Sequence, residues 1–431
     1  MMIRLVLLLI LCGITISTFS QSLFESSFSS AGSTDEKKFE LFGYVKSSAF
    51  SDFEESKFIA AETALKLETK KGKYGNAFIE ARYQKFLSHI EDQDKSDELY
   101  LREAYCNLTF HDFDFRIGQQ IIVWGRADGF NPTNNITPFD MTVFSSDEDD
   151  RRRENFVFQT IYNFYPFKVE LDWVPIYRAS KLPIDNIQMN NIAWGANDFP
   201  SLETDNSSYG IKLDLEKPAI DASVSFFNGY YKMPSIEWNH QPGNTEVYLN
   251  AFRTSIIGAD FSTVTGKYGL RGEFAYSIPD DKTHNQQFIP SKQLEYTLGF
   301  DREWGNFSLI AQYIGKYIID FSDDTPTPSN VFQATLAHYN QLLFAQTDEI
   351  THSVSLRPAA NLLHETLSIE MLSLANCTTE EFYFKPLVEY QVSDNIALNV
   401  GAQLYYGPDA TMFGLLEKQI NAGFAEVKIN F

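Results

Sequence analysis

Polar and apolar residues alternate along most of the chain with a period of two, which is the pattern of a β-strand with one apolar and one polar face. In the segment 207–217, for example, Ile211, Leu213 and Leu215 alternate with lysine, aspartate and glutamate. Segments of this kind recur from Phe39 to the end of the chain. The sequence therefore predicts an all-β protein made of many antiparallel strands.

The connections between these strands alternate in length: eight are short turns and nine are longer and mostly polar. Eight turns and nine loops give about eighteen strands, and this even, alternating arrangement is typical of transmembrane β-barrels with short periplasmic turns and long extracellular loops. One misread hairpin would leave sixteen strands. The short turns are expected at 71–73, 111–112, 165–166, 217–218, 265–266, 305–306, 360–363 and 393–395, and the loops near 51–56, 89–97, 125–152, 179–204, 232–246, 279–290, 321–347, 376–379 and 408–420.

The two ends of the chain indicate export and assembly in a membrane. Residues 1–20 have the features of a signal peptide: Arg4, an apolar run too short to span a bilayer, and small residues before the expected cleavage site. Residues 21–38 are serine-rich and are expected to form a flexible lead-in, so that the barrel spans 39–431. The final strand ends in Phe431, which resembles the signal that bacterial outer-membrane proteins present to the barrel assembly machinery.

Composition and charge narrow the class further. After the signal peptide no stretch holds about 18 consecutive apolar residues, so membrane spans must be strands in contact with lipid. Aromatic residues make up 15% of the chain, as interfacial girdles require. A lysine or arginine directed at lipid costs about 2–4 kcal/mol, so the polar faces should line the lumen. The net charge of −22 argues against nucleic acid as a partner, and it favours cations in a pore only where the acids face water.

The most distinctive local sequence follows the fifth expected strand. That strand, 114–124, contains R-I-G-Q-Q from Arg116, and W-G-R-A-D-G-F-N-P and then P-F-D follow it. The segment resembles porin-like outer-membrane proteins in which R-I-G-x-Q leads to W-G-x-x-D-x-x-N-P and later P-x-D. The match is specific over about 40 residues, from Arg116 to about Arg153. The resemblance implies a barrel of transport type and brings no firm substrate.

In general porins a long early loop folds inward and narrows the channel, so the resemblance implies an inward constriction loop near 125–153. The charged run 147–153 has two open interpretations: a solvated outer segment with local ion pairs, or charges that face the barrel wall. The inward wall charges either pair with one another to fill a polar interior or take part in selectivity. The candidate selectivity residues are Arg126, Asp128 and Asp140 from the loop, with Glu80, Arg82, Arg116, Glu170 and Asp172 from the wall.

Residues 331–346 depart from the strand pattern. Phe332, Leu336, Tyr339 and Leu343 recur at helical spacing without an intervening glycine or proline. The spacing predicts a short amphipathic helix in a long loop. It either folds over the mouth or into the lumen, or packs the loops together.

The sequence predicts no enzyme, cofactor or metal site. The seven histidines are scattered, the acidic run 147–150 lacks the spaced ligands of a calcium loop, and His352 and Ser353 should point to opposite faces of a strand. Barrels of 16–18 strands leave an aqueous channel. We therefore predict a passive diffusion channel for small hydrophilic solutes in a bacterial outer membrane. The alternative is a surface adhesin or a structural barrel, and an outer-membrane hydrolase is the less favoured third class. The sequence leaves homo-oligomerisation open.

Overall fold

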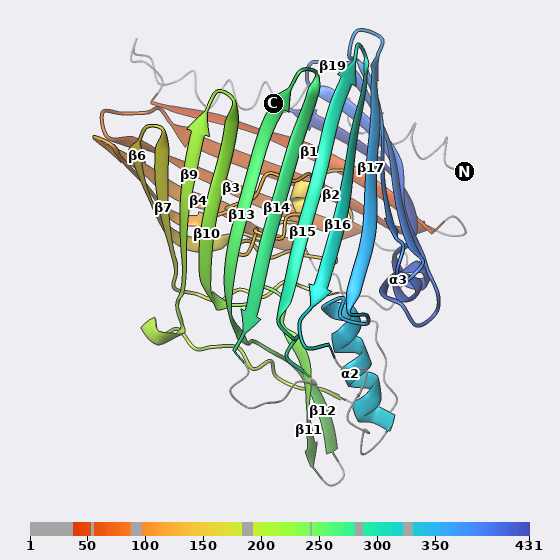
Figure 1. Cartoon of the computed structure of the whole chain (residues 1–431). Helices are drawn as coiled ribbons and strands as arrows, with labels where there is room; N and C mark the ends of the chain where they lie inside the picture. Colours follow the sequence, from red (N-terminus) through yellow and green to blue (C-terminus); the bar gives the residue numbers. More distant parts are fainter. Residues whose placement is uncertain are drawn as a thin grey trace.

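The computed structural model describes residues 38–431 except 53–55, 88–96, 183–192, 242–243, 281–287 and 322–330. The predicted signal peptide and almost all of the predicted lead-in lie outside the described residues. The rest forms one barrel with additional elements in its long loops (Figure 1).

Eighteen strands form a single antiparallel sheet that closes on itself, because the first strand pairs with the last. The structure thus has the predicted eighteen strands rather than sixteen. The barrel strands are β1 (Phe39–Ser51), β2 (Ser56–Thr69), β3 (Gly75–Leu87), β4 (Glu98–Phe110), β5 (Phe113–Gln120), β6 (Asn155–Phe164), β7 (Phe167–Val174), β9 (Ser208–Lys217), β10 (Ile220–Tyr230), β13 (Arg253–Thr265), β14 (Tyr268–Pro279), β15 (Gln293–Trp304), β16 (Phe307–Ile318), β17 (Ile350–Leu362), β18 (Leu367–Asn376), β19 (Glu381–Ser393), β20 (Ile396–Tyr406) and β21 (Ala422–Asn430).

The short turns occur where the sequence predicts them, with one exception. The turn expected at 360–363 lies at 363–366, because β17 continues to Leu362. Leu363, His364 and Glu365 adopt positive φ angles there, a conformation that residues of these types rarely take. The sequence has no glycine at this turn from which its position could be predicted. The strand expected at 114–124 likewise ends early, at Gln120, because the chain then leaves the wall.

The long loops carry structure that the sequence did not predict. Strands β8 (Ala193–Trp194), β11 (Ser235–Gln241) and β12 (Asn244–Asn250) form a separate three-stranded sheet beyond the barrel. Helix α3 (Met412–Ile420) occupies the last long loop, and two 3₁₀ helices, η1 (Glu148–Arg151) and η2 (Thr204–Asn206), lie in others.

The predicted helix is present as α2 (Val331–Leu343) and serves to pack loops together. It lies beside the β11–β12 hairpin (Figure 1). Leu336 is fully buried in a cluster with Ile236 and Val247 of that hairpin. The Asn340 amide donates to the carbonyl of Ile236 and accepts from its N–H, as a neighbouring strand would. Of the alternatives left open by the sequence, the structure selects loop packing.

The barrel is apolar outside and polar inside. Outward side chains such as Val224, Ile257 and Leu298 are about half exposed. Inward carboxylates such as Asp214 and Glu273 are nearly fully buried. A water-soluble sheet shows the opposite distribution, so this arrangement suits a wall with lipid outside and polar contents inside. Within the described ranges, no helix is long and apolar enough to cross a membrane.

Aromatic side chains gather around the short-turn end of the barrel. The rings of Phe113 and Tyr162 stack with centroids 4.7 Å apart, and Phe164 continues the series at 5.3 Å from Tyr162. Tyr165, in the adjacent turn, is 80% exposed. Amphipathic rings in this position mark the level of lipid headgroups.

If the outer face meets lipid, a charge near the middle of a strand should destabilise the barrel. We expect Ile257→Lys in β13 to lower the free energy of unfolding in lipid bilayers by about 2–4 kcal/mol, because lysine is costly near the midplane. Thr265→Lys, at the short-turn end of the same face, should cost about 0–1 kcal/mol. Urea titration of both variants provides the measurement. Equal costs would show that lipid does not cover this face.

Candidate functional site

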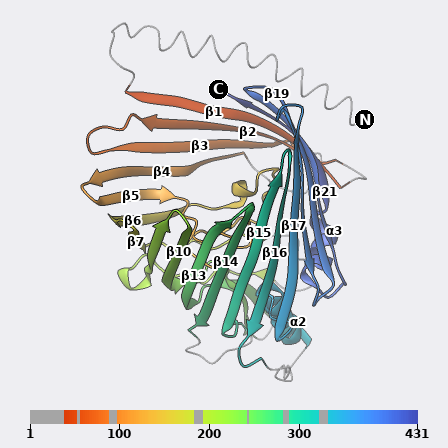
Figure 2. The same cartoon turned by 45° about the horizontal axis from the view of Figure 1, so that its top comes forward.

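The loop between β5 and β6, residues 121–154, lies inside the barrel, and we call it the inserted loop (Figure 2). Its side chains and backbone contact strands on all sides of the lumen. It hydrogen-bonds or pairs with residues of β1, β3, β4, β7, β9, β13, β14, β15, β17, β19, β20 and β21.

On one side of the lumen the inserted loop forms a dry core with the wall. Ile122, Trp124 and Ile136 are each less than 7% exposed. They pack against inward apolar side chains of β6, β7, β10, β13 and β14, among them Val157 and Phe227. The Trp124 indole N–H donates to Glu170 Oε1 at 2.8 Å, so its polar atom is satisfied within this core. The loop therefore fills this half of the barrel.

The W-G-x-x-D-x-x-N-P segment wraps around the carboxylate of Glu273 on β14. The backbone N–H groups of Arg126 and Ala127 donate to Glu273 Oε1. Asn131 Nδ2 donates to the same oxygen at 3.0 Å, and Thr133 Oγ1 donates to Oε2 at 3.0 Å.

Gly125 allows this close approach. Its φ is +95°, and an added Cβ would lie 2.4 Å from Glu273 Oε1. The turn therefore requires glycine for both its backbone conformation and its space. The motif's glycine and asparagine thus seat a wall carboxylate.

Charged side chains of the same segment reach two sections of the wall. Arg126 pairs with Asp214 of β9 at 3.1 Å and with Asp260 of β13. Asp128 receives two hydrogen bonds from Arg357 Nη1 of β17, at 2.8 and 3.0 Å. The inserted loop therefore presents a cation to an acidic section of the wall and an anion to a basic one.

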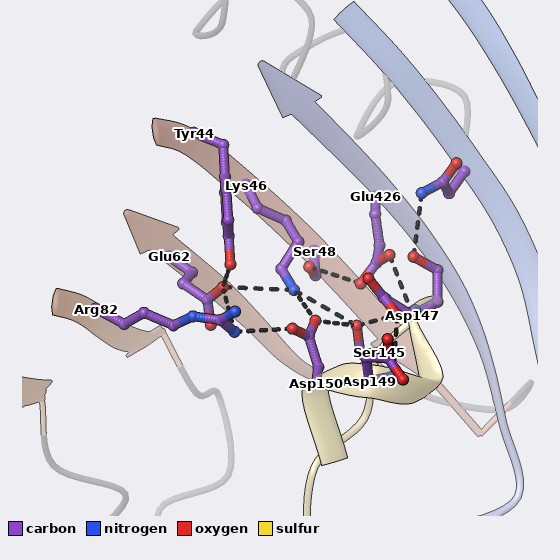
Figure 3. Close-up of polar contacts among 12 residues, drawn as sticks. Tyr44, Lys46, Ser48, Glu62, Arg82, Ser145, Asp147, Asp149, Asp150 and Glu426 are labelled. Atoms are coloured by element: carbon purple, nitrogen blue, oxygen red, sulfur yellow. Dashed lines mark hydrogen bonds and ion pairs between the residues drawn. The ribbon is translucent and has the colours of Figure 1, made fainter. Parts of the chain in front are cut away.

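The far end of the inserted loop is held by a buried ionic network (Figure 3). Asp150 accepts from Lys46 Nζ of β1 and from Arg82 Nη1 of β3, both at 2.8 Å. Glu62 of β2 lies 3.5 Å from the Lys46 ammonium and 3.7 Å from Arg82. The four side chains are between 6% and 11% exposed. Ser145 Oγ completes the shell around Asp150 at 2.6 Å.

The wall cations determine the ionisation of the loop carboxylates. Burial opposes the charge on Asp150, but the ammonium of Lys46 and the guanidinium of Arg82 outweigh it. They hold the pKa of Asp150 well below its usual range. Glu148 behaves in the same way: burial is outweighed by Lys385 of β19, and its pKa is lowered. Both carboxylates are therefore charged at neutral pH.

The residues of the run 147–153 divide between the two interpretations: three side chains face the wall, and others are exposed or paired locally. Glu148 and Asp150 bind wall cations, and Arg151 donates to Gln403 of β20. A local ion pair forms between Arg152 and Asp149, at 3.3 Å. The wall-facing interpretation therefore holds for Glu148, Asp150 and Arg151, whereas Asp149 is exposed and pairs locally.

The structure separates the eight predicted selectivity residues. Arg126 and Asp128 of the inserted loop bind wall residues. Arg82 and Glu170 of the wall bind residues of the inserted loop. Asp140 pairs instead with Lys181 of the next long loop, at 3.3 Å.

The other three side chains lie among residues of the wall. Arg116 donates to Asn107 at 2.7 Å on the neighbouring strand. Glu80 binds Arg82 at 2.6 Å and Lys66 at 3.3 Å. Asp172 is 3% exposed, beside Glu170 on β7, and neither of its oxygens has a hydrogen-bond partner within the described part of the chain.

Several anchoring residues were missed from the sequence: Lys46, Glu148, Asp150, Asp214, Asp260, Glu273, Arg357 and Lys385. Period-two alternation does place the wall members on inward faces, as in β14, where Arg271 and Glu273 alternate with Leu270 and Phe274. Alternation carries no information on which loop residue each inward charge meets.

A cavity of 430 Å³ remains on the other side of the inserted loop. The segment 145–150 forms one side of it, and β1 and β17–β21 form the other. It extends to Gln391 and Asn430, close to the short-turn end. None of the eight predicted selectivity residues lines it. Its charged lining residues are Lys46, Asp147, Glu148, Asp149, Asp150, Arg357, Glu370, Lys385, Glu389 and Lys428.

The histidine and serine that are adjacent in the sequence do not form a catalytic pair. His352 is exposed on the outer face and hydrogen-bonds Tyr313, 2.7 Å away, whereas Ser353 is buried on the inner face. Among the described residues, no group of three histidine, cysteine or acidic side chains is arranged to hold a metal ion.

Comparisons with known proteins agree with this architecture. Residues 24–148 match a family described as "Protein of unknown function (DUF1302)". That match spans β1–β5 and the inserted loop as far as Glu148. No curated protein is significantly similar in sequence to the chain.

Solved structures match over almost the full length. OccAB4 of Acinetobacter baumannii aligns with 93% of this chain and 99% of its own, with a TM-score of 0.55 and 11% identity. OccK10 (OpdN) of Pseudomonas aeruginosa aligns over 92% and 99%, with a TM-score of 0.53 and 10% identity. The outer membrane protein opdK of Pseudomonas aeruginosa aligns over 91% and 98%, with a TM-score of 0.53 and 8% identity. The chain has a porin-like barrel fold. At these identities the likeness establishes the fold alone.

Replacing the central carboxylate of the ionic network should loosen the inserted loop. In Asp150→Asn, Lys46 and Arg82 lose their loop counter-charge; Lys46 keeps Glu62, and Arg82 keeps Glu62 and Glu80. We expect the opening free energy of residues 145–151 to fall by about 3 kcal/mol. Hydrogen exchange of these amides measures it. Asp149→Asn changes an exposed pair and should cost less than about 1 kcal/mol. Equal protection in the two variants would show that the ionic network around Asp150 does not hold the inserted loop in place.

The same network has a defined pH dependence. The pKa of Asp150 is lower in the folded protein than its unfolded value of about 3.9. Its contribution to stability is therefore fully present above about pH 4 and is lost as the pH falls further. The ionic network around Asp150 should consequently hold the inserted loop at neutral pH.

Proposed function

We propose that the protein is a passive diffusion channel for small hydrophilic solutes in a bacterial outer membrane, with the inserted loop as its constriction. The observation that carries the proposal is the division of the lumen. The loop fills one half with an apolar core and leaves a polar cavity of 430 Å³ along the other. A barrel built only as an anchor has no need of a charged internal cavity beside a clamped loop.

Three further features support a channel in this membrane. The outer face is apolar and the inner face polar. Barrels of 16–18 strands are wide enough to hold an aqueous path. The similar solved structures include an outer membrane protein. On this proposal, Arg126, Asp128, Arg82 and Glu170 hold the constriction in place, and solute passes between the segment 145–150 and β17–β21.

The structure suggests a clean way to open the constriction. Asp140 N–H donates to the Arg151 carbonyl at 2.7 Å, and Phe139 pairs with Arg152, so the segment 141–150 is closed at its base. Replacing Met141–Asp150 with Asn-Gly should preserve this neck as a hairpin turn. Single-channel conductance should then rise, because one side of the cavity is gone, and Lys46 and Arg82 regain water.

The matched control shortens a loop remote from the cavity. Replacing Glu237–Tyr248 with Asn-Gly truncates the β11–β12 hairpin and keeps its Ile236–Leu249 pair. This variant should conduct like the wild type. The constriction proposal fails if the folded Met141–Asp150 replacement conducts no better than this control. Absence of conductance and of solute-dependent liposome swelling in folded wild-type protein would reject the channel altogether.

The last residue offers a test of assembly. Phe431 and Gly43 exchange two backbone hydrogen bonds of 3.0 Å, which form the last rung of the β1–β21 seam. We propose that the Phe431 side chain, on the outer face, is also read by the barrel assembly machinery. Phe431→Asp should lower the heat-modifiable, folded form in the outer-membrane fraction without affecting signal cleavage. Asn430→Asp places the same charge on the inner face and should assemble normally, and equal levels of both variants would refute the role of Phe431.

A further inference from the structure

We infer that the passage beside the inserted loop prefers small cations that donate hydrogen bonds, such as solutes with an ammonium or guanidinium group, over anions. This inference rests on the proposed channel function and adds a solute class to it. The supporting observations concern which charges in the cavity meet water and which polar atom lacks a partner.

The basic residues of the cavity are largely neutralised by the protein itself. Lys46 binds Asp150, and Lys385 binds Glu148. Arg357 binds Asp128 at 2.8 Å and Glu370 at 3.1 Å. The side chains of Lys46 and Lys385 are only 11% and 5% exposed. These cations hold the inserted loop and have little capacity left for a passing anion.

The acidic residues are distributed differently. Asp147, Asp149 and Glu389 line the cavity and are exposed. The Asp149 side chain pairs with Arg152 at 3.3 Å but is still 68% exposed. Lys428 remains as a partly exposed cation, with its ammonium 4.6 Å from the ring centroid of Tyr44. The lining as a whole carries four basic and six acidic residues. Water in the cavity therefore meets an excess of carboxylates.

A buried acceptor in the same lining lacks a donor. Asn399 of β20 is 7% exposed and lines the cavity beside the inserted loop. Its Nδ2 donates to Ser146 Oγ at 3.1 Å, but its Oδ1 accepts no hydrogen bond from the described residues. A buried acceptor without a donor costs about 1–3 kcal/mol. A solute with hydrogen-bond donors that reaches this oxygen can supply the missing donor, and a cation without N–H or O–H groups cannot.

The two observations favour the same solute. In a narrow space with low-dielectric walls, the field of the exposed carboxylates is concentrated, which raises the local concentration of cations and lowers that of anions. The Asn399 acceptor then distinguishes among cations by their hydrogen-bond donors. Charge preference and donor preference thus have separate sources and are tested separately.

The charge preference is measured by reversal potential across planar bilayers in a KCl gradient, with purified full-length mature protein. We expect a permeability ratio of potassium to chloride above one. In the triple variant Asp147→Asn, Asp149→Asn, Glu389→Gln this ratio should fall at least about two-fold, because the exposed carboxylates are gone. Asp97→Asn removes one acid outside the cavity lining, at the start of β4, and should leave the ratio unchanged.

The donor preference is measured as the permeability of guanidinium relative to tetramethylammonium, which has no N–H group. Asn399→Leu should lower this ratio, whereas Ser146→Ala removes the Asn399–Ser146 hydrogen bond and keeps the acceptor, so its ratio should be maintained. A wild-type ratio that favours chloride, or a triple variant with unchanged selectivity, overturns the charge preference while the channel proposal stands. An unchanged ratio in Asn399→Leu overturns the donor preference. Folded wild-type protein that conducts no ions at all overturns the channel proposal and this inference together.

Discussion

The pairing of wall charges with charges of the inserted loop is the interaction on which the interior depends. Inward strand positions carry acids on β7–β14 and bases on β1, β3, β17 and β19, and each group would be costly if buried without a counter-charge. The inserted loop supplies counter-charges to both groups. Arg126 pairs with the acidic strands, and Asp128, Glu148 and Asp150 pair with the basic ones. Each ion pair neutralises one buried charge on the wall and one on the inserted loop, so the wall and the loop stabilise one another.

The apolar part of the inserted loop determines where the remaining space lies. Trp124 and Ile136 form a packed core with β6–β14, and this core excludes water. The polar segment 145–150 follows that core in the chain and binds the opposite wall through ion pairs. The cavity of 430 Å³ lies on the other side, and its character follows from which of its charges are already paired with the inserted loop.

Much of the fold follows from local features of the chain. Period-two alternation, turn residues and the alternation of short and long connections are properties of neighbouring residues, and they predict eighteen strands with nearly all of their turns. Two features do not follow from the local pattern. The turn at 363–366 uses positive φ angles without glycine, and β5 stops at Gln120 although its apolar pattern continues.

The sequence by itself thus determined the barrel, the inward direction of Glu80, Arg82, Glu170 and Asp172, and the special character of the segment from Trp124 to Pro132. Only the tertiary structure decided what that segment does, because its partners lie on strands as far as 229 residues away, as with Asp128 and Arg357. It also decided that α2 packs loops together and that the open cavity lies beside β17–β21. Alternation depends on adjacent residues, whereas the pairing of charges across a lumen depends on the closure of the whole sheet.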